Sequence, residues 1–472
     1  MSEGSLGFDF AIIGGGSAGY AAARTAVGHG LKTVVIDGAD PLGGLCILRG
    51  CMPSKTLIES ANRNLTIRRA REFGLRAEQG SADIVAIRDR KRRLIADFAG
   101  YRQGQLNDGR FTLLRGKATF TDSRSLLVSL RDGSEQVVRF RAACIATGSM
   151  VNVPPMPGLR ETGFWTSDDI LDAEELPSSF IVLGGGAIAL EMAHYLDGMS
   201  RKVTLIQRSD GLLGTMDAEC GAAVAKAFRE RGIDVYCGTS VQQVEVVDGK
   251  KQITFEYGGT SVRLSADEIL VATGRSPAVD GLGLESSGVE TQGRKIGVNK
   301  GMQTNHPHIF AAGDVCSPLD IVHIAIQQGE TAAHNAAALL RGELPQATMD
   351  YRLSLFGVFC EPQAAMVGAT EAQLRRDGVP YATASYPFDD HGKSMVMGET
   401  DGFVKLIAHR ETGEILGASV VGPHATEIIH EVVVAMQFHC TVKQFMVIPH
   451  YHPTLSEIWT YPAEELSDEL GL

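Results

Sequence analysis

Long apolar runs are missing from this sequence, since none reaches the roughly 18 residues that a membrane-spanning helix needs. The N-terminus also lacks a basic segment followed by an apolar one, so we expect no secretory signal peptide. Positive charge is scarce, because 44 Lys and Arg residues face 56 Asp and Glu residues, giving a formal net charge of −12. A nucleic-acid-binding protein needs a positive surface. These absences predict a protein that binds neither a membrane nor nucleic acid.

Cysteine is too sparse for a disulfide framework, with 8 cysteines in 472 residues. Six of them lie far apart, and we interpret them as small buried side chains: Cys144, Cys220, Cys237, Cys316, Cys360 and Cys440. We therefore expect a reducing cytoplasm, in which a persistent disulfide would be catalytic.

The other two cysteines, Cys46 and Cys51, lie in the segment Gly-Gly-Leu-Cys-Ile-Leu-Arg-Gly-Cys-Met-Pro-Ser-Lys at residues 43–55. In a regular helix their Cα atoms would be about 8 Å apart, beyond the about 7 Å that a disulfide allows. A disulfide therefore requires a distorted backbone. Pro53 supplies a reason because its ring crowds the carbonyl of Arg49, and Gly50 adds conformational freedom next to Cys51. A strained disulfide at a helix start exchanges electrons. The alternative is two unrelated reduced cysteines in a glycine-rich loop.

A glycine-rich motif follows the first apolar run. Gly14, Gly16 and Gly19 form G-x-G-x-x-G between a short strand and an alanine-rich helix. These glycines provide a tight turn, a close approach to a pyrophosphate and close helix–strand packing. Asp37 ends the second strand, where a carboxylate can accept hydrogen bonds from an adenosine ribose. Residues 8–37 are therefore predicted to bind a dinucleotide.

The same pattern recurs 170 residues later, with Gly184 for Gly14, Gly186 for Gly16, Ala189 for Gly19 and Gln207 for Asp37. An internal duplication of this kind predicts a second dinucleotide. The second unit has no acid for the ribose, and Arg208 follows Gln207. Because an arginine attracts a 2′-phosphate, the second site leans towards NADP(H), with NAD(H) left open. An exposed loop arginine is the alternative interpretation.

Two Ala-Thr-Gly sequences close the two units, and we assign Gly148 and Gly274 as cofactor contacts. An apolar strand then ends at Gly313 and Asp314, which we expect to make a second contact with the first dinucleotide. From about residue 350 the composition changes, and alternating apolar runs indicate an α+β domain.

The segment around Cys46 and Cys51 resembles the redox-active element of the flavin-dependent pyridine nucleotide–disulfide oxidoreductases, and its Pro-Ser-Lys ending is most similar to that of dihydrolipoamide dehydrogenase. The resemblance implies an α/β fold with two Rossmann-like domains, for FAD and NAD(P), and a C-terminal α+β dimerisation domain. The expected domains are residues 1–150 (FAD, first part), 151–275 (NAD(P)), 276–346 (FAD, return segment) and 347–472 (dimerisation).

The resemblance also implies the cofactors and the residues that hold them. FAD is expected at Gly14, Gly16, Gly19, Asp37, Gly44, Gly148 and Asp314, and NAD(P)(H), leaning NADP(H), at Gly184, Gly186, Ala189, Gln207, Arg208 and Gly274. Lys55 and Glu191 are predicted to pair beside the flavin. No metal site is expected.

Four residues are expected to carry the chemistry. Cys51 would face the flavin, and Cys46 would exchange with the substrate disulfide. His452, in the run His-Pro-Thr-x-Ser-Glu, would act as general acid–base and be polarised by Glu457. In the family this run enters the partner subunit's active site, so a homodimer with shared active sites is expected.

The expected function is an FAD-dependent transfer of two electrons between NAD(P)(H) and a dithiol or disulfide, with dihydrolipoamide dehydrogenase activity favoured. The partner would be a small disulfide or a lipoyl carrier protein. The ending Glu-Leu-Gly-Leu lacks the cysteine pair of mercuric reductase, and no extra N-terminal domain is expected. Arg208 and the intervening Ile-Leu-Arg at residues 47–49 favour the alternative, an NADPH-dependent reductase of another disulfide, a quinone or a metal ion. A flavin-binding structural subunit is the non-enzymatic alternative.

Overall fold

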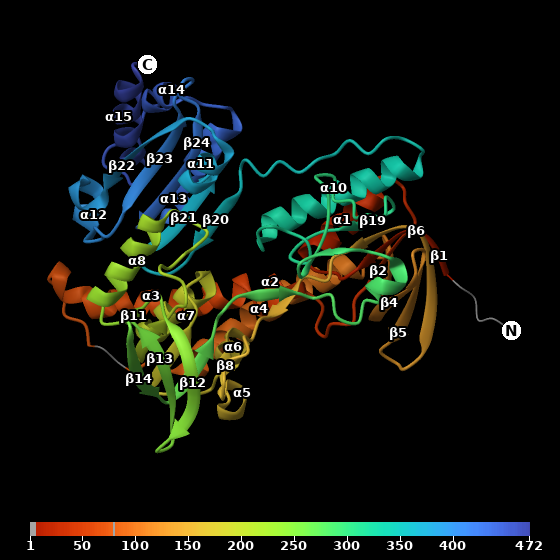
Figure 1. Cartoon of the computed structure of the whole chain (residues 1–472), viewed down its shortest axis with the longest axis horizontal. Helices are drawn as coiled ribbons and strands as arrows, with labels where there is room; N and C mark the ends of the chain where they lie inside the picture. The colour runs from red at the N-terminus through yellow and green to blue at the C-terminus, as the bar shows by residue number, and fades with distance from the viewer. Residues whose placement is uncertain (1–5, 79–80) are drawn as a thin grey trace. The chain divides into compact units, whose positions relative to one another are not determined.

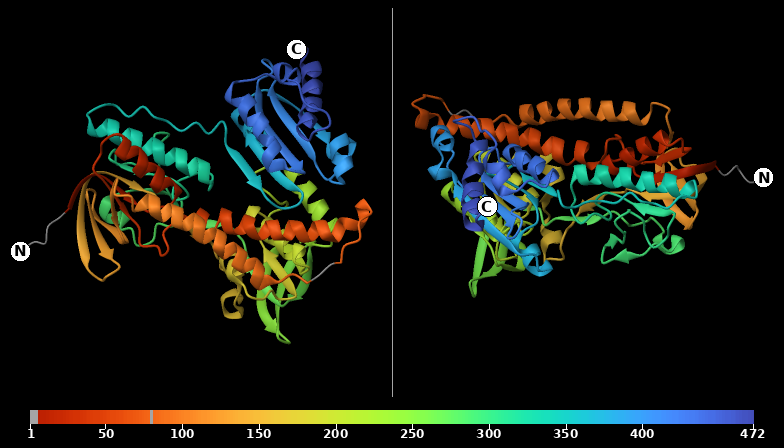
Figure 2. Two further views of the ribbon diagram at one scale, coloured as in Figure 1. Left: turned by 180° about the vertical axis from the view of Figure 1, so that it is seen from behind. Right: turned by 90° about the horizontal axis from the view of Figure 1, so that it is seen from above.

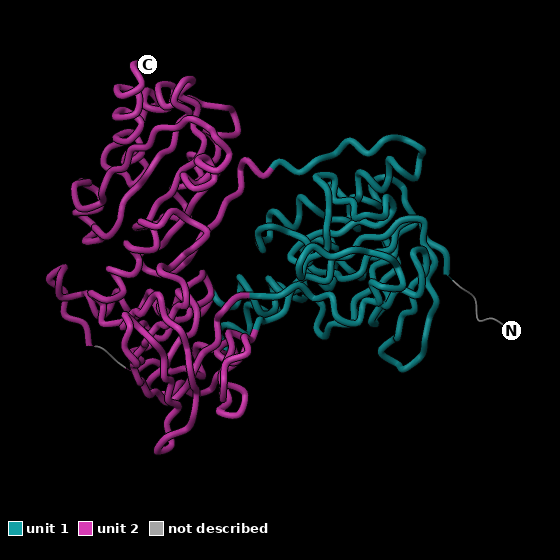
Figure 3. The backbone as a smooth tube through the Cα atoms, viewed as in Figure 1, with its two compact units in different colours: residues 1–54, 89–152, 275–350 teal, residues 55–88, 153–274, 351–472 magenta. Residues whose placement is uncertain are grey.

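The computed structural model describes residues 6–78 and 81–472, which form two compact units (Figure 3). The first unit contains the N-terminal residues up to 54 together with residues 89–152 and 275–350. The second contains residues 55–88, 153–274 and 351–472. The predicted domain boundaries at residues 150, 275 and 346 remain a prediction.

A mostly parallel sheet forms the centre of the first unit (Figure 1). Its strand order is β3-β2-β1-β6-β5-β4, and β19 pairs with β6. The strands are β1 (Leu6–Ile13), β2 (Thr33–Ile36), β3 (Thr112–Leu114), β4 (Gly116–Asp122), β5 (Ser125–Leu130), β6 (Glu135–Ile145) and β19 (Ile309–Ala311). Ile13 pairs with both Ile36 and Ile145, and Ile145 also pairs with Ala311. The carboxyl ends of four parallel strands therefore meet at one edge of the sheet.

Two helices pack closely on this sheet. The helix α1 (Ser17–Gly28) follows the first glycine motif, and α10 (Val322–Leu340) follows the return strand β19. The two helices lie side by side in both views of Figure 2. Gly329 permits this approach, because a Cβ atom there would lie 2.2 Å from the carbonyl oxygen of Ala18. The return segment is thus packed directly against the first dinucleotide motif.

The second unit contains another parallel sheet, with strand order β11-β10-β9-β15-β8. Its strands are β8 (Trp165–Thr166), β9 (Ser179–Leu183), β10 (Lys202–Ile206), β11 (Asp234–Tyr236) and β15 (Glu268–Val271), with helices α7 (Ala187–Gly198) and α8 (Ala218–Glu230). A separate antiparallel sheet contains β12 (Ser240–Val247), β13 (Lys250–Tyr257) and β14 (Thr260–Ala266). Leu183 pairs with Ile206 and Val271, so the strand ends align as in the first unit.

The C-terminal part of the second unit is an antiparallel sheet of order β20-β21-β24-β23-β22 covered by helices. These strands are β20 (Leu355–Val358), β21 (Gln363–Gly368), β22 (Tyr381–Pro387), β23 (Phe403–His409) and β24 (Ile415–Gly422); the longer helices are α13 (Ala425–Gln437) and α15 (Thr460–Leu470). Trp459 is fully buried in its core, and its Nε1 donates to the carbonyl of Ile428 at 3.1 Å. The predicted fold class is confirmed.

The long helices α3 (Cys51–Arg69) and α4 (Ile84–Leu106) each contribute residues to both units. In the described part of the chain, no helix combines the length and apolarity needed to cross a membrane. Of the six cysteines predicted to be buried, Cys144, Cys220, Cys316 and Cys360 are buried, whereas Cys237 and Cys440 are only half-buried.

A buried histidine in the second unit should make stability depend on pH. His194 is fully buried on α7; its Nε2 lies 2.7 Å from Asn62 Oδ1, and its Nδ1 lies 3.2 Å from Arg231 Nη1. Burial first, and then the charge of Arg231, lower the pKa of His194 well below its ordinary value. Below about pH 6.5, His194 therefore binds a proton in the unfolded chain but stays neutral in the folded protein.

We expect the free energy of unfolding to fall as the pH drops below about 6.5, by up to about 1.4 kcal/mol per pH unit from this residue. His194→Gln should flatten that slope in urea titrations between pH 7 and pH 5. The matched control is His430→Gln, since His430 is exposed and should leave the slope unchanged. An equal slope in all three proteins would show that His194 does not cause the acid sensitivity.

Candidate functional site

A cavity of about 760 Å³ lies in the first unit, at the aligned carboxyl ends of β1, β2, β6 and β19. Sequence analysis predicted many of the residues that line it: Gly14, Gly16, Asp37, Gly44, Cys46, Cys51, Gly148 and Asp314. Residues separated by up to 300 positions are therefore brought to one site by the register of the sheet.

Glycines form one wall of the cavity because a side chain would not fit. Gly14 has φ +102°, and a Cβ atom there would lie 2.4 Å from the carbonyl oxygen of Ala146. A Cβ atom on Gly44, which has φ +72°, would lie 2.7 Å from the Cα of Gly16. Gly19 lies beneath this wall, where a Cβ atom would lie 1.8 Å from the carbonyl oxygen of Gly14.

Gly16 is also the N-cap residue of α1, so the first amide groups of a 12-residue helix begin at this wall. Unpaired helix N–H groups and the positive end of the helix dipole favour a phosphate group. A backbone cradle at a helix start fits the pyrophosphate of a dinucleotide.

Asp37 is held over the first turn of the motif by backbone groups. Its Oδ2 accepts from the amide of Gly15 at 2.8 Å, and its Oδ1 accepts from the amide of Ala39 at 2.8 Å. Gly15 was not predicted as a site residue, although a Cβ atom there would lie 3.0 Å from Asp37 Oδ2. Each carboxylate oxygen retains a lone pair for a ribose hydroxyl.

Asp314 reaches the cavity from the return segment and has partners that sequence analysis missed. Ser149 Oγ donates to Asp314 Oδ2 at 2.6 Å, and Arg275 Nε donates to Ser149 Oγ at 2.8 Å. Burial raises the pKa of Asp314, and the Ser149 hydrogen bond opposes that rise. A short antiparallel pair, β7 (Ser149–Val151) and β16 (Arg275–Pro277), brings these residues together. The only sequence signal was their position directly after the two Ala-Thr-Gly motifs.

The chain breaks its helix between the two cysteines. The short helix α2 (Gly44–Leu48) holds Cys46, and α3 begins at Cys51; both residues are half-buried and line the cavity. The break lies at Gly50, where a Cβ atom would lie 3.1 Å from the Cα of Cys46. Pro53 does not cause it, because proline is compatible with the first turn of α3, where its missing N–H has no helical partner. The disulfide itself remains a prediction.

The second motif reproduces the backbone of the first. Gly184 has φ +124°, and a Cβ atom there would lie 2.3 Å from the carbonyl oxygen of Ala272, the counterpart of Ala146. Gly186 is the N-cap of α7, Ala189 is buried in that helix, and Gly274 follows β15 with φ +102°.

Gln207 occupies the place that Asp37 has in the first motif. A Cβ atom on Gly185 would lie 2.8 Å from the Gln207 side chain. The neighbouring Arg208 is exposed. The turn therefore presents an amide and an accessible guanidinium where the first motif presents a carboxylate.

The predicted pair between Lys55 and Glu191 is present within the second unit. Lys55 Nζ lies 2.8 Å from both carboxylate oxygens of Glu191, which is buried. The backbone amide of Phe359 donates to Glu191 Oε1 at 3.1 Å, and Lys55 Nζ lies 4.6 Å from the centre of the Phe359 ring. A buried carboxylate is thus matched by a cation and an amide, which compensates its desolvation.

His452 and Glu457 also meet within the second unit. His452 Nδ1 lies 3.0 Å from Glu457 Oε2, and the two side chains are 80% and 13% exposed. The short helix η3 (Ser456–Trp459) holds Glu457, and its buried Trp459 fixes this helix against the domain core. The arrangement orients the imidazole through Nδ1 and leaves the ring largely exposed, which suits a general base.

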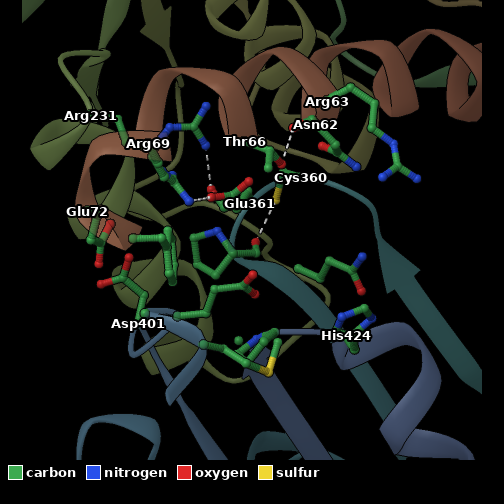
Figure 4. Close-up of a pocket in the computed structure, with 18 of the residues that line it drawn as sticks. Asn62, Arg63, Thr66, Arg69, Glu72, Arg231, Cys360, Glu361, Asp401 and His424 are labelled. Atoms are coloured by element: carbon green, nitrogen blue, oxygen red, sulfur yellow. Dashed lines mark hydrogen bonds and ion pairs between the residues drawn. The ribbon is translucent and has the colours of Figure 1, made fainter. Parts of the chain in front are cut away.

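A second cavity, of about 470 Å³, lies within the second unit between α3 and the turn at residues 360–363 (Figure 4). Arg69 forms an ion pair with Glu361, and Arg231 Nη1 donates to the Glu361 carbonyl at 2.8 Å. Cys360 Sγ lies 3.1 Å from the carbonyl oxygen of Pro362. Among the described residues, none of those predicted as site residues lines this cavity.

Two family models match the chain. The pyridine nucleotide-disulphide oxidoreductase model matches residues 8–329, and the dimerisation-domain model of the same group matches residues 356–463. The chain belongs to the pyridine nucleotide-disulphide oxidoreductases. The predicted family is therefore confirmed.

Curated relatives within this family support the same assignment. A dihydrolipoyl dehydrogenase of Bacillus subtilis is 34% identical over 462 residues, covering 95% of this chain and 96% of that protein. A mercuric reductase of Acidithiobacillus ferrooxidans is 35% identical over 439 residues, covering 92% of this chain and 78% of that protein. Among solved structures, the Cu(II) complex of the HOCl-induced flavoprotein disulfide reductase RclA from Escherichia coli matches with a TM-score of 0.85, 26% identity, and 98% and 100% coverage.

This oxidoreductase is thus an FAD-dependent enzyme of the disulfide oxidoreductase family and uses NAD(P)H. The glycine wall, the helix start and Asp37 of the first unit fit FAD, so the expected cofactors are confirmed, while the choice between NAD and NADP stays a prediction. The dimerisation domain supports a homodimer.

The wall formed by Gly44 can be tested through flavin content. Gly44→Ala should weaken FAD binding about tenfold or more, because alanine is strained at positive φ and its methyl group would strike the Gly16 backbone. The measurement is the ratio of absorbance at 450 nm to that at 280 nm after dialysis. Gly104→Ala is the control, since Gly104 lies in α4 with open space around it. Undiminished flavin in Gly44→Ala would exclude this wall from the FAD site.

Proposed function

We propose that this enzyme is a dihydrolipoamide dehydrogenase, which oxidises a dihydrolipoyl dithiol and passes two electrons to NAD(P)+. The observation that carries the proposal is the placement of Cys46 and Cys51 on the wall of the FAD cavity, on either side of a break in the helix. Similarity to dihydrolipoyl dehydrogenase along 95% of the chain supports this substrate class. The substrate would be free dihydrolipoamide or the lipoyl group of a carrier protein.

In this reaction the two cysteines form the disulfide that accepts electrons from the substrate. One substrate thiol loses its proton to His452 and attacks Cys46, breaking the bond to Cys51. The second substrate thiol then attacks the mixed disulfide, which releases cyclic disulfide product and the Cys46 thiol. Bound FAD supplies the two-electron link between the dithiol and the nicotinamide. Cys51 is the thiol assigned to face it.

The remaining polar residues prepare these groups for reaction. Glu457 holds His452 Nδ1, so that the free Nε2 can accept the substrate proton. His452 serves the active site of the other subunit, which makes the homodimer the active form. Lys55, fixed by Glu191, supplies positive charge that stabilises the reduced cofactor.

A second candidate function is NADPH-dependent reduction of a metal ion or another disulfide. Arg208 favours NADPH over NADH, and the similar proteins include a mercuric reductase and a disulfide reductase solved with Cu(II). A cysteine pair that exchanges with a disulfide can also bind a soft metal ion through its thiolates. The altered Ile47-Leu48-Arg49 segment between the cysteines would adapt the site to such a substrate.

Steady-state rates distinguish these candidates. We expect oxidation of dihydrolipoamide with NAD+ or NADP+ to exceed the NADPH-driven reduction of oxidised glutathione, Hg(II) and Cu(II). Cys46→Ser should abolish dihydrolipoamide turnover, because no thiol remains to exchange, while reduction of the flavin by NAD(P)H persists. The control is Cys440→Ser, at a half-buried cysteine outside the cavity. Rapid reduction of a metal ion with no dihydrolipoamide turnover would favour the second function.

Arg208 should control the choice of nucleotide. Arg208→Glu is expected to lower kcat/KM with NADP(H) relative to NAD(H) by about tenfold or more, because a carboxylate repels the 2′-phosphate that a guanidinium attracts. The ratio of kcat/KM for the two nucleotides is the measurement. Arg160→Glu, at another exposed arginine of the second unit, makes the same charge change and should leave the ratio unaltered. A ratio equal to that of the unmodified enzyme in Arg208→Glu would remove the case for a 2′-phosphate site.

A further inference from the structure

A third ionisable side chain lies behind the His452–Glu457 pair. His391, the N-cap residue of the short helix α12 (Gly392–Met397), is fully buried. Its Nε2 lies 3.5 Å from Glu457 Oε1, and its Nδ1 lies 2.9 Å from Ser394 Oγ. Glu457 therefore lies between two imidazoles, one exposed and one buried, and each of its oxygens faces a different ring.

The hydrogen bonds available to His391 define its tautomer. Burial lowers the pKa of His391, so the ring is neutral at neutral pH and has one donor and one acceptor. The Ser394 hydroxyl can donate to Nδ1, which leaves the proton on Nε2. Within residues 6–78 and 81–472, this buried Nε2 makes no hydrogen bond of normal geometry. The carboxylate that faces it, at 3.5 Å, is that of Glu457, and the backbone of Thr454 is a second hydrogen-bonding group beside the ring. A buried N–H group without an acceptor costs free energy. The Nε2–H group of His391 therefore favours the Glu457 rotamer that brings the carboxylate towards it.

The surroundings of His391 allow little movement. Phe388 and Tyr461 pack edge-on against the ring, with centroid distances of 6.3 and 6.5 Å. Tyr461 in turn stacks on Tyr386 at 4.1 Å. The charged or titratable neighbours, from its own and from the packed elements, are Glu457, His452, Tyr461, Asp390 and Lys393. Of these, Glu457 raises the pKa of His391 and His452 lowers it.

We propose that His391 is a positioning residue for the reaction: it donates from Nε2 to Glu457 and thereby holds the carboxylate against His452. The inference deepens the proposed function, since it rests on His452 being the base for thiol exchange. A carboxylate held at Nδ1 orients the His452 imidazole and stabilises the positive charge that the ring gains when Nε2 takes a proton. A carboxylate released towards solvent loses most of this effect, because water screens its charge.

The matched pair of variants is His391→Met and His391→Gln. Methionine fills the space without a donor, whereas the glutamine amide nitrogen can replace Nε2 and donate to Glu457. We expect His391→Met to lower kcat/KM for dihydrolipoamide roughly tenfold to a hundredfold and to move the acidic limb of its pH profile to lower pH. His391→Gln should restore most of the rate and the position of that limb. His430→Gln, at an exposed histidine, is the control.

A second measurement keeps the inference separate from the choice of substrate. In the dimeric holoenzyme with histidine labelled at Cε1 by carbon-13, the signal missing from His452→Gln identifies His452. Its titration should move to lower pH in His391→Met and return in His391→Gln, whether or not the enzyme oxidises dihydrolipoamide. If His391→Met is unstable, Ser394→Ala tests the same coupling, because it frees Nδ1 to carry the proton; it should move the titration in the same direction.

The outcomes are distinct. An unmoved His452 titration in His391→Met would overturn the positioning role. So would equal changes in His391→Met and His391→Gln, because they would indicate loss of packing rather than loss of a donor. In a His452→Gln background, His391→Met should produce no further fall in the rate of thiol exchange, and a multiplied effect would show that His391 acts independently. If the unmodified enzyme does not oxidise dihydrolipoamide, that result contradicts only the proposed function and not the positioning role of His391.

Discussion

The architecture depends on a close contact between two backbone segments, at a glycine where no side chain would fit. At Gly14 and again at Gly184, the chain turns out of a parallel strand so close to a neighbouring carbonyl that a Cβ atom would fall within 2.4 Å of it. After each turn a helix begins, and its N-terminus lies at the edge of the sheet where the carboxyl ends of the parallel strands are aligned. A dinucleotide site needs this exposed backbone, because amide groups must approach the phosphates directly.

The two turns have the same backbone conformation and differ in the side chain that packs against them. A carboxylate covers the first turn, accepting from the amide of Gly15, whereas the amide side chain of Gln207 covers the second. One backbone arrangement is thus used twice, with a different side chain at the end of the second strand of each unit. The same turn is therefore found beneath two chemically different side chains.

Local patterns predicted the fold and much of the site, because the glycine motifs, the strand before each motif and the acid after it are close in sequence. Asp37 could be identified in this way. Ser149 and Arg275 could not, because a hydrogen bond that joins residues 126 positions apart leaves no local pattern. For the break between the cysteines, the sequence pointed to both Pro53 and Gly50, and the close contact lies at Gly50. His391 was missed because nothing nearby in the sequence distinguishes it from an ordinary turn histidine.

The close packing of α1 against α10 has a consequence for how the cofactor site assembles. Gly329 lets a helix from the return segment lie directly on the helix whose start faces the cavity. The orientation of that helix start therefore depends on a segment synthesised some three hundred residues later. FAD binding and docking of the return segment are consequently coupled equilibria, in which either event favours the other. A nascent chain that ends before β19 would have the phosphate-binding motif without the support that keeps it in place.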